Sequence, residues 1–177
     1  MNFAEYNVKD ANLEEILLAL KSLDTVEAVA LGGSRSTGAS EENSDYDIYV
    51  YCAEIPTAET RENLLEKYCS IAEFGNHYWE SEDNTVMNNG IPVDIIYREV
   101  DRFGRYIDTV IKGGKAFNGY TTAFWHNIKN SKVLFDKTGS FTKFRDMAQI
   151  DFPENLRRSI IKNNRNLLNG KLPSYDR

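Results

Sequence analysis

Two short segments in the first third of the chain constrain its fold more than any other feature. Residues 29–31 are apolar and lead into residues 32–35, Gly-Gly-Ser-Arg, and residues 44–50 read Ser-Asp-Tyr-Asp-Ile-Tyr-Val. The first segment predicts a buried strand that turns sharply at the glycines and opens a helix, because glycine tolerates a tight turn. The second segment predicts a strand. Because strand side chains alternate between faces, one face carries Asp45, Asp47 and Tyr49, and the other carries Tyr46, Ile48 and Val50.

The glycine turn is suited to holding phosphate groups. A helix start offers unpaired N–H groups and the positive end of the helix dipole to an anion. Ser34 and Ser36 add hydroxyls, and Arg35 adds a bidentate cationic fork. We therefore predict that Gly33, Ser34, Arg35 and Ser36 bind phosphate. Taken alone, the segment also fits an ordinary turn in which Ser34 only caps a helix.

The paired acids of the second segment are suited to holding a metal ion. Like charges on one face of a strand are unfavourable unless a cation lies between them, and hard cations prefer oxygen ligands. Asp45 and Asp47 therefore predict a magnesium site opposite the phosphate turn. A solvated strand end is the alternative for a single Asp-x-Asp pair.

The two segments together resemble the signature of the DNA polymerase beta-like nucleotidyltransferase superfamily. Gly33-Ser34 is followed by ten intervening residues and then by Asp45-Tyr46-Asp47. The resemblance is closest to small-molecule and antibiotic nucleotidyltransferases of the aminoglycoside or lincosamide type, which often show a Gly-Gly-Ser-Arg turn followed by Ser-Asp-x-Asp. It directly covers only the first third of the chain.

The resemblance implies a third carboxylate on a neighbouring strand, and Asp94 is the candidate. Asn89-Gly90 predicts a two-residue hairpin between residues 85–88 and residues 91–97. Asp94 would then be a lone acid in an apolar strand, which is costly unless it is paired or bound to metal. Val93, Ile95 and Tyr97 would face one way, and Asp94 and Ile96 the other. A buried Asp94 paired with a hydroxyl or an arginine is the alternative.

The resemblance implies a metal-dependent enzyme with Asp45, Asp47 and Asp94 as catalytic residues and metal ligands. Two Mg²⁺ ions would hold a nucleoside triphosphate, with ATP the expected one. A nucleoside monophosphate, AMP, would pass to a hydroxyl of a small molecule, an antibiotic being one candidate, with release of pyrophosphate. Asp94 could also act as general base.

Two other functions stay open. An antitoxin-like nucleotidyltransferase would modify a partner protein, but such minimal enzymes end soon after the third carboxylate, whereas this chain continues to residue 177. A catalytically silent nucleotide-binding module would have little reason to keep three mutually repelling acids.

Composition limits the partners and the compartment. The formal net charge of the 177 residues is -6, which argues against long nucleic acids as acceptors. We find no signal peptide and no long apolar span, so we expect a cytoplasmic protein without membrane contact. Cys52, Cys69, His77 and His126 form no zinc pattern, and the two cysteines are expected to be free.

The expected fold class is α+β, with a mixed, mainly antiparallel sheet flanked by helices and a helical C-terminal region. We expect the helices to pack on one side of the sheet. We predict a catalytic domain over residues 1–114 and a mostly helical extension over residues 115–177 that holds the acceptor. A homodimer that buries the apolar stripe of the last helix is an open alternative to docking on the domain itself.

Periodicity predicts the individual elements. The expected helices are residues 13–23, capped by Asn12 with Glu15, and residues 57–72, 100–111, 121–128, 140–148 and 153–169; the expected strands are residues 25–31, 74–79 and 132–136, with a loop at residues 80–84. Glu99 is either an alternative base or a favourable acid at the start of a helix. Several aromatic residues could stack on a base or a sugar, but each is equally suited to the core: Tyr49, Tyr78, Trp79, Tyr97, Phe124 and Trp125.

Overall fold

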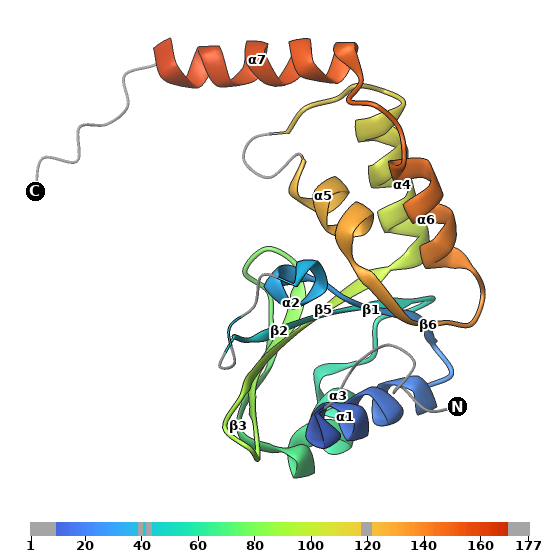
Figure 1. The fold of residues 1–177 in the computed structure, drawn as a ribbon, viewed down its shortest axis with the longest axis vertical. Helices are drawn as coiled ribbons and strands as arrows, with labels where there is room; N and C mark the ends of the chain where they lie inside the picture. Colours follow the sequence, from blue (N-terminus) through green and yellow to red (C-terminus); the bar gives the residue numbers. More distant parts are fainter. Residues whose placement is uncertain (1–9, 39–40, 42–43, 118–121, 170–177) are drawn as a thin grey trace, which may run out of the picture.

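The chain folds around one six-stranded mixed sheet with helices on both faces (Figure 1). The computed structural model describes residues 10–38, 41, 44–117 and 122–169. The strand order is β3-β4-β5-β2-β1-β6, in which β2 and β5 run parallel and every other neighbouring pair is antiparallel. The predicted α+β class with a mixed, mainly antiparallel sheet is therefore confirmed.

The elements follow one another along the chain in a mixed order. The strands are β1 (Val26–Leu31), β2 (Tyr46–Cys52), β3 (Cys69–Asn76), β4 (Ser81–Met87), β5 (Pro92–Glu99) and β6 (Lys132–Asp136). The helices are α1 (Ala11–Ser22), α2 (Gly33–Thr37), α3 (Ala58–Leu65), the 3₁₀ turn η2 (Glu66–Tyr68), α4 (Val100–Ile111), α5 (Ala123–Asn130), α6 (Ser140–Ala148) and α7 (Glu154–Asn169).

The sheet separates two apolar cores. On one face, Ile48, Val50 and Ile95 pack against α1 and Leu65 of α3. On the other face, Tyr49 and Ile96 pack against α4, α5 and α6. The expectation of helices on one side only was wrong, because β1 and β2 carry apolar side chains on both faces and each face needs a cover.

The N-cap of the first helix lies two positions before the expected one. Asp10 is the N-cap, and its carboxylate accepts hydrogen bonds from the backbone N–H groups of Asn12 and Leu13 at 3.0 and 3.3 Å. The prediction of Asn12 as cap was therefore wrong. Aspartate at this position also complements the helix dipole with a full negative charge.

The predicted helix over residues 57–72 ends early. The α-helix stops at Leu65, one 3₁₀ turn follows, and the chain enters β3 at Cys69. Ile71, which lies within the predicted helix, is 64% exposed on this edge strand. Pairing of β3 with β4 outweighs the local helical periodicity, since tertiary context overrides a weak propensity.

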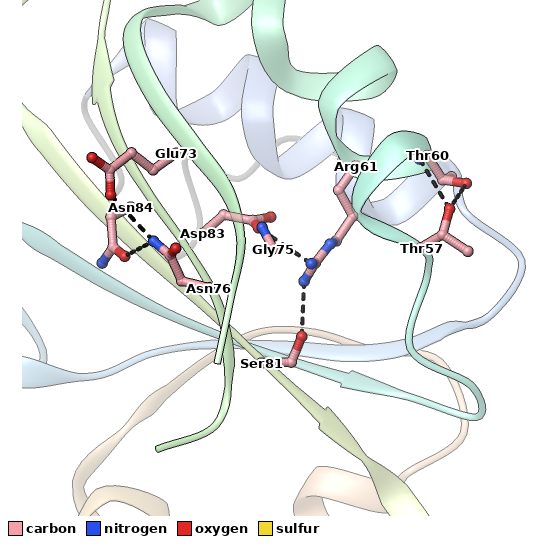
Figure 2. A network of polar contacts seen from close by, with 9 residues as sticks. All are labelled: Thr57, Thr60, Arg61, Glu73, Gly75, Asn76, Ser81, Asp83 and Asn84. Atoms are coloured by element: carbon pink, nitrogen blue, oxygen red, sulfur yellow. Dashed lines mark hydrogen bonds and ion pairs between the residues drawn. The ribbon is translucent and has the colours of Figure 1, made fainter. Parts of the chain in front are cut away.

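The segment expected to be a loop, residues 80–84, is mostly strand β4. Asp83 looked like a loop residue, yet its side chain is fully buried and lies 3.4 Å from the guanidinium of Arg61 on α3 (Figure 2). The guanidinium also donates to Ser81 at 3.1 Å and stacks over the ring of Tyr97. A long-range ion pair of this kind leaves no local signal in the sequence.

The hairpin between β4 and β5 has a three-residue loop rather than the predicted two-residue turn. Gly90 N–H donates to the Met87 carbonyl at 2.8 Å, and Met87 N–H donates to the Ile91 carbonyl at 2.9 Å. Gly90 has φ +86°, the left-handed conformation that closes a type I turn with a bulge. The hairpin itself, and the division of β5 side chains between two faces, are confirmed.

The C-terminal part adds a strand to the sheet and then leaves it. β6 pairs with β1, while α4 ends before Gly113-Gly114 as expected. Figure 1 shows α7 extending away from the sheet beyond the other helices. Leu156 of α7 is buried and Ile161 is 59% exposed, whereas the side chains of Leu167 and Leu168 lie outside the described residues. Within the described ranges, no helix is both long and apolar enough to cross a bilayer.

Candidate active site

The glycine turn after β1 is pressed against two side chains of β2. A Cβ atom built on Gly32 would lie 2.2 Å from ring carbon Cε2 of Tyr49, and one on Gly33 would lie 1.8 Å from Oδ2 of Asp47. Gly33 also has φ +59°. The Gly32 N–H donates to the Asp47 carbonyl at 2.8 Å. Only glycines allow the turn to come this close to the Asp47 carboxylate.

Asp47 and Asp94 occupy directly paired positions on the parallel strands β2 and β5. Tyr49 and Ile96, two residues further along each strand, both lie in the core beneath α4, α5 and α6. Because side chains two residues apart share a face, Asp47 and Asp94 both point to that same face. Each is half-buried. The structure thus brings together two acids that are 47 residues apart in the sequence (94 − 47).

The electrostatics of Asp47 show that negative charge is concentrated here. Burial raises the pKa of the Asp47 carboxyl above its ordinary value, and the charges of Asp45 and Asp94 raise it further. Asp45 is exposed and lies just before β2, rather than within the strand as expected. A bound cation would offset the repulsion that these three acids impose on one another.

The four predicted phosphate-binding residues differ in what their side chains do. The Ser36 hydroxyl donates to the Gly33 carbonyl at 2.8 Å, inside α2. Arg35 Nε donates to the carbonyls of Ser44 and Asp45 at 2.9 and 3.0 Å, and its guanidinium stacks 3.9 Å from the Tyr46 ring centroid. Ser34 is half-buried beside the turn. Arg35 therefore fastens the loop that carries Asp45, and its predicted phosphate contact stays a prediction.

The residues fit a magnesium site in donor type and in charge. Carboxylate oxygens are the ligands that Mg²⁺ prefers, and the close approach of Gly33 leaves the Asp47 carboxylate directly beside the glycine turn. Among the residues that the structure describes, no three His, Cys, Asp or Glu side chains are gathered into a ready-made metal cluster. Without a cation, the carboxylates of Asp45, Asp47 and Asp94 repel one another. Their shared ligation of Mg²⁺ therefore stays a prediction.

A cavity of about 720 Å³ lies further along the sheet, where β5 leads into α4. Arg98 on its wall follows Asp94 by four residues, about 13 Å along the strand at about 3.3 Å per residue, and shares its face. Other lining residues come from four separate segments: Pro56, Trp79, Glu80, Arg102, Phe103 and Phe124. The volume lies in the range typical of sites for small molecules.

Arg98 is buried at the base of this cavity and fully engaged. Its guanidinium donates to both Glu80 carboxylate oxygens at 2.8 Å and to the Tyr51 hydroxyl at 3.1 Å. The rings of Tyr49 and Phe103 lie 4.3 and 4.6 Å from its Cζ atom. Charge neutralisation by Glu80 makes this burial tolerable.

Comparison with protein families gives a match over most of the chain. The family model described as Polymerase beta, Nucleotidyltransferase matches residues 14–116. The chain belongs to this nucleotidyltransferase family. The superfamily resemblance seen in the glycine turn and the paired acids is thereby confirmed, and the protein is an enzyme of the nucleotidyltransferase class.

Two solved structures resemble this nucleotidyltransferase over nearly its whole length. One is described as a toxin-antitoxin with AMP-PNP; it shares 15% sequence identity with a TM-score of 0.47, and the match covers 90% of this chain and 97% of that chain. The other is described as a mutant of the toxin-antitoxin MntA-HpeT, at 14% identity with a TM-score of 0.46 and the same coverage of 90% and 97%. No curated protein matches the nucleotidyltransferase significantly.

Sequence reasoning missed several residues around the site of the nucleotidyltransferase. Asn84 donates from Nδ2 to Oδ1 of Asp94 at 2.9 Å, and Glu80 pairs with Arg98. Both Glu80 and Asn84 belong to the segment expected to be a loop. Asp83, Thr85 and Met87 are buried at alternate positions of β4, but Asp83 and Thr85 are polar, so no alternation of apolar and polar residue types marks this segment as a strand.

The remaining expected residues are divided between core and surface. Tyr49, Tyr97 and Trp125 are buried, whereas Tyr78 and Trp79 are 73% and 81% exposed. Burial raises the pKa of Tyr49 to about 12, so its hydroxyl stays protonated while it accepts a hydrogen bond from Asn127 at 2.8 Å. Glu99 is the N-cap of α4 and makes no capping hydrogen bond through its side chain. Cys52 and Cys69 are free, as expected.

Proposed function

We propose that this nucleotidyltransferase transfers AMP from ATP to a hydroxyl group of a small molecule and releases pyrophosphate. The observation that carries the proposal is the pairing of Asp47 with Asp94 on parallel strands, beside a glycine turn that touches Asp47. Two acids and an anion-binding turn in this arrangement are suited to a triphosphate with its divalent cations.

Asp45, Asp47 and Asp94 would hold Mg²⁺ through their carboxylate oxygens. When bound, two such ions supply charge neutralisation for the triphosphate and lower the pKa of the acceptor hydroxyl. The Ser34 hydroxyl and the first N–H groups of α2 would bind the β and γ phosphates. Arg35, through the carbonyls of Ser44 and Asp45, would keep the acidic loop in place during binding.

Asp94 is the proposed general base. Its Oδ1 atom accepts a hydrogen bond from Asn84, so Oδ2 is the oxygen proposed to accept the proton of the acceptor hydroxyl. The acceptor oxygen then forms a bond to the α phosphorus, while the bond from the α phosphorus to the bridging oxygen breaks. Pyrophosphate leaves with that electron pair, and the proton ends on Asp94.

The cavity beside Arg98 is the proposed seat of the acceptor, in place of the predicted extension over residues 115–177, which contributes Phe124 to the lining. Its walls include Arg98, which lies on the same sheet face as Asp94, and Tyr97, which lies on the other face. Aromatic rings in the lining suit the apolar side of a ring-containing molecule. Arg98 lies about 13 Å along the strand from Asp94. Ile96 between them is buried beneath the helices, so a molecule seated in the cavity would have to pass around this core to bring a hydroxyl to Asp94.

Pyrophosphate release tests the proposal. The enzyme is incubated with each labelled nucleoside triphosphate, Mg²⁺ and panels of hydroxylated small molecules, beside an Asp47→Asn variant. We expect release that depends on both Mg²⁺ and an acceptor, is greatest with ATP and is absent in the variant. Transfer of the label only to a partner protein would support the antitoxin-like function and exclude the small-molecule acceptor. Binding of nucleotide without release under any condition would leave a silent module.

Neighbouring aromatic residues provide a matched test of the acceptor seat. Trp79 lines the cavity, whereas Tyr78 does not, and both side chains are largely exposed. Trp79→Ala should raise the KM for the acceptor about tenfold without changing the KM for ATP, which corresponds to about 1.4 kcal/mol of lost binding. Tyr78→Ala should change neither. Equal effects of the two substitutions would exclude the cavity as the seat.

A further inference from the structure

We propose that Asn84 is a positioning residue for Asp94, and that an amide chain across three strands fixes its orientation. The chain runs from Glu73 and Asn76 on β3, through Asn84 on β4, to Asp94 on β5. This inference rests on the proposed function, because it assigns Asp94 Oδ2 as the oxygen that faces the reaction.

Asn84 is in direct contact with Asp94. Asn84 and Asp94 are paired across the antiparallel β4–β5 ladder, so their side chains lie next to each other on one face. Asn84 Nδ2 donates to Asp94 Oδ1 at 2.9 Å. Both residues are half-buried, which limits competition from water. One oxygen of the carboxylate is therefore held, and the other is left for a metal ion or a proton.

The orientation of the Asn84 amide is fixed by its hydrogen-bond partners on both sides. Asn76 Nδ2 donates to Asn84 Oδ1 at 2.8 Å and lies 3.4 Å from Glu73 Oε2, an arrangement visible in Figure 2. If the Asn84 amide were reversed, its oxygen would face the Asp94 carboxylate and its NH₂ group would face that of Asn76. Both contacts would be repulsive, so the neighbours on either side permit only one orientation.

The side chain that donates to Asp94 is uncharged. Two nearby acids are paired with arginines: Asp83 with Arg61 and Glu80 with Arg98. Asp94 instead receives an amide, which orients the carboxylate and leaves its negative charge in place. A cation at position 84 would cancel the charge that attracts Mg²⁺, whereas an amide does not.

The substitution Asn84→Ala tests the positioning role, with Asn88→Ala as the matched control. Asn88 also donates through its side-chain amide, but to the Lys67 carbonyl at 3.0 Å and away from Asp94. Residues that orient a metal ligand typically change metal affinity or activity about 10- to 100-fold. We expect Asn84→Ala to raise the Mg²⁺ concentration for half-maximal activity by about that factor, with the KM for ATP at saturating Mg²⁺ unchanged.

A second readout does not depend on turnover. Electron paramagnetic resonance of Mn²⁺ with α,β-methylene-ATP, compared with the same mixture without protein because the nucleotide itself binds Mn²⁺, measures metal binding to the protein. Asn84→Ala should weaken Mn²⁺ binding, Asn76→Ala should weaken it less because only the orienting contact is lost, and Asn88→Ala should leave it unchanged. If Asn84→Ala does not fold, the order of Asn76→Ala against Asn88→Ala decides.

The outcomes separate this inference from the proposed function. Mn²⁺ binding by Asn84→Ala equal to that of the wild type, while Asp94→Asn binds none, would overturn the positioning role and leave the function intact. The opposite outcome is Mn²⁺ binding in the expected order among the variants but no pyrophosphate release by the wild type with any acceptor. It would uphold the positioning role and overturn the proposed function.

Discussion

The Asp47 carboxylate occupies the space that a side chain at Gly33 would need. A Cβ atom at Gly33 would lie 1.8 Å from Asp47 Oδ2, and Gly33 has φ +59°. Gly33→Ala should therefore cost the roughly 1–2 kcal/mol of a left-handed alanine and, in addition, push Asp47 out of place. We expect a lower free energy of unfolding in urea and weaker binding of the metal–nucleotide complex.

Gly90 is the control for the backbone part of this effect. It has φ +86°, and no atom lies within 4 Å of a Cβ built on it. Gly90→Ala should lower the free energy of unfolding by the backbone cost alone and leave nucleotide binding unchanged. Equal losses of stability and equal nucleotide binding in the two variants would show that the Gly33–Asp47 contact has no role in binding.

Asp47→Asn should stabilise the fold at neutral pH while abolishing activity. Burial, then the charges of Asp45 and Asp94, raise the pKa of the folded carboxyl above 3.8, so the folded state binds this proton more tightly than the unfolded chain does. The ionised carboxylate therefore destabilises the fold above the folded pKa. The gain in Tm from asparagine should be full at pH 7, shrink as the pH falls through the folded pKa, and vanish below about 3.8.

Asp101→Asn is the control for this pH dependence. Asp101 is an exposed acid in the first turn of α4, where its charge complements the helix dipole. Its substitution should lower stability at pH 7 by about 0.3–1 kcal/mol, the opposite sign. A Tm for Asp47→Asn well below that of the wild type at pH 7 would contradict the prediction that the ionised Asp47 carboxylate destabilises the fold.

Glu80→Gln should destabilise the protein strongly. The substitution leaves the buried Arg98 guanidinium without its charge partner, and removing one member of a buried pair typically costs about 3–5 kcal/mol. The surface pair of Asp108 with Lys112, at 2.7 Å, provides the comparison. Lys112→Met should cost less than about 1 kcal/mol in urea unfolding. A loss for Glu80→Gln as small as that for Lys112→Met would mean that the pair is screened by solvent.

Arg35→Lys separates a loop-fastening role from a phosphate-binding role. Lysine supplies a positive charge for phosphate but cannot reproduce the two-carbonyl contact of Nε with Ser44 and Asp45. If fastening the loop dominates, Arg35→Lys and Arg35→Ala should raise the KM for ATP to a similar extent, about tenfold. Near wild-type kinetics for Arg35→Lys would show that charge on the phosphate is what matters.

Local patterns in the sequence predict much of this fold. The alternation in residues 46–50 and 93–97 placed each side chain on the correct face, because one face of each strand had to bury Ile48, Val50 and Ile95. The helix from Val100 to Ile111 and its end at Gly113-Gly114 follow from helical periodicity and a glycine stop. These elements are determined by contacts that repeat along the chain itself.

The errors fall where distant residues decide the structure. β3 and β4 pair with each other at the sheet edge, and the buried Asp83 carboxylate is held by the Gly75 N–H of β3 and by Arg61, 22 residues earlier in the chain (83 − 61). Both strands were expected to be partly helix or loop. The helices on the second face likewise pack against Tyr49 and Tyr51 of β2. No local sequence pattern specifies these contacts with α4 and α6.

The site shows the same division. Asp47 and Asp94 could be predicted because acids in apolar strands are conspicuous, and their paired register follows from the fold. Asn84 could not, since an uncharged amide in a polar stretch has no distinctive pattern and its role depends on the register of β4 against β5. The joint metal site, the phosphate contacts and the division at residue 114 remain predictions.

Titration calorimetry with α,β-methylene-ATP, with and without Mg²⁺, measures whether Asp47 and Asp94 bind the nucleotide through a metal ion. We expect the wild type to bind this nucleotide only with Mg²⁺. Asp47→Asn and Asp94→Asn should each lose more affinity than the roughly 10- to 100-fold typical of residues that only orient a ligand. Equal wild-type binding with and without Mg²⁺, matched by both variants, would show that the acids do not hold a metal–nucleotide complex.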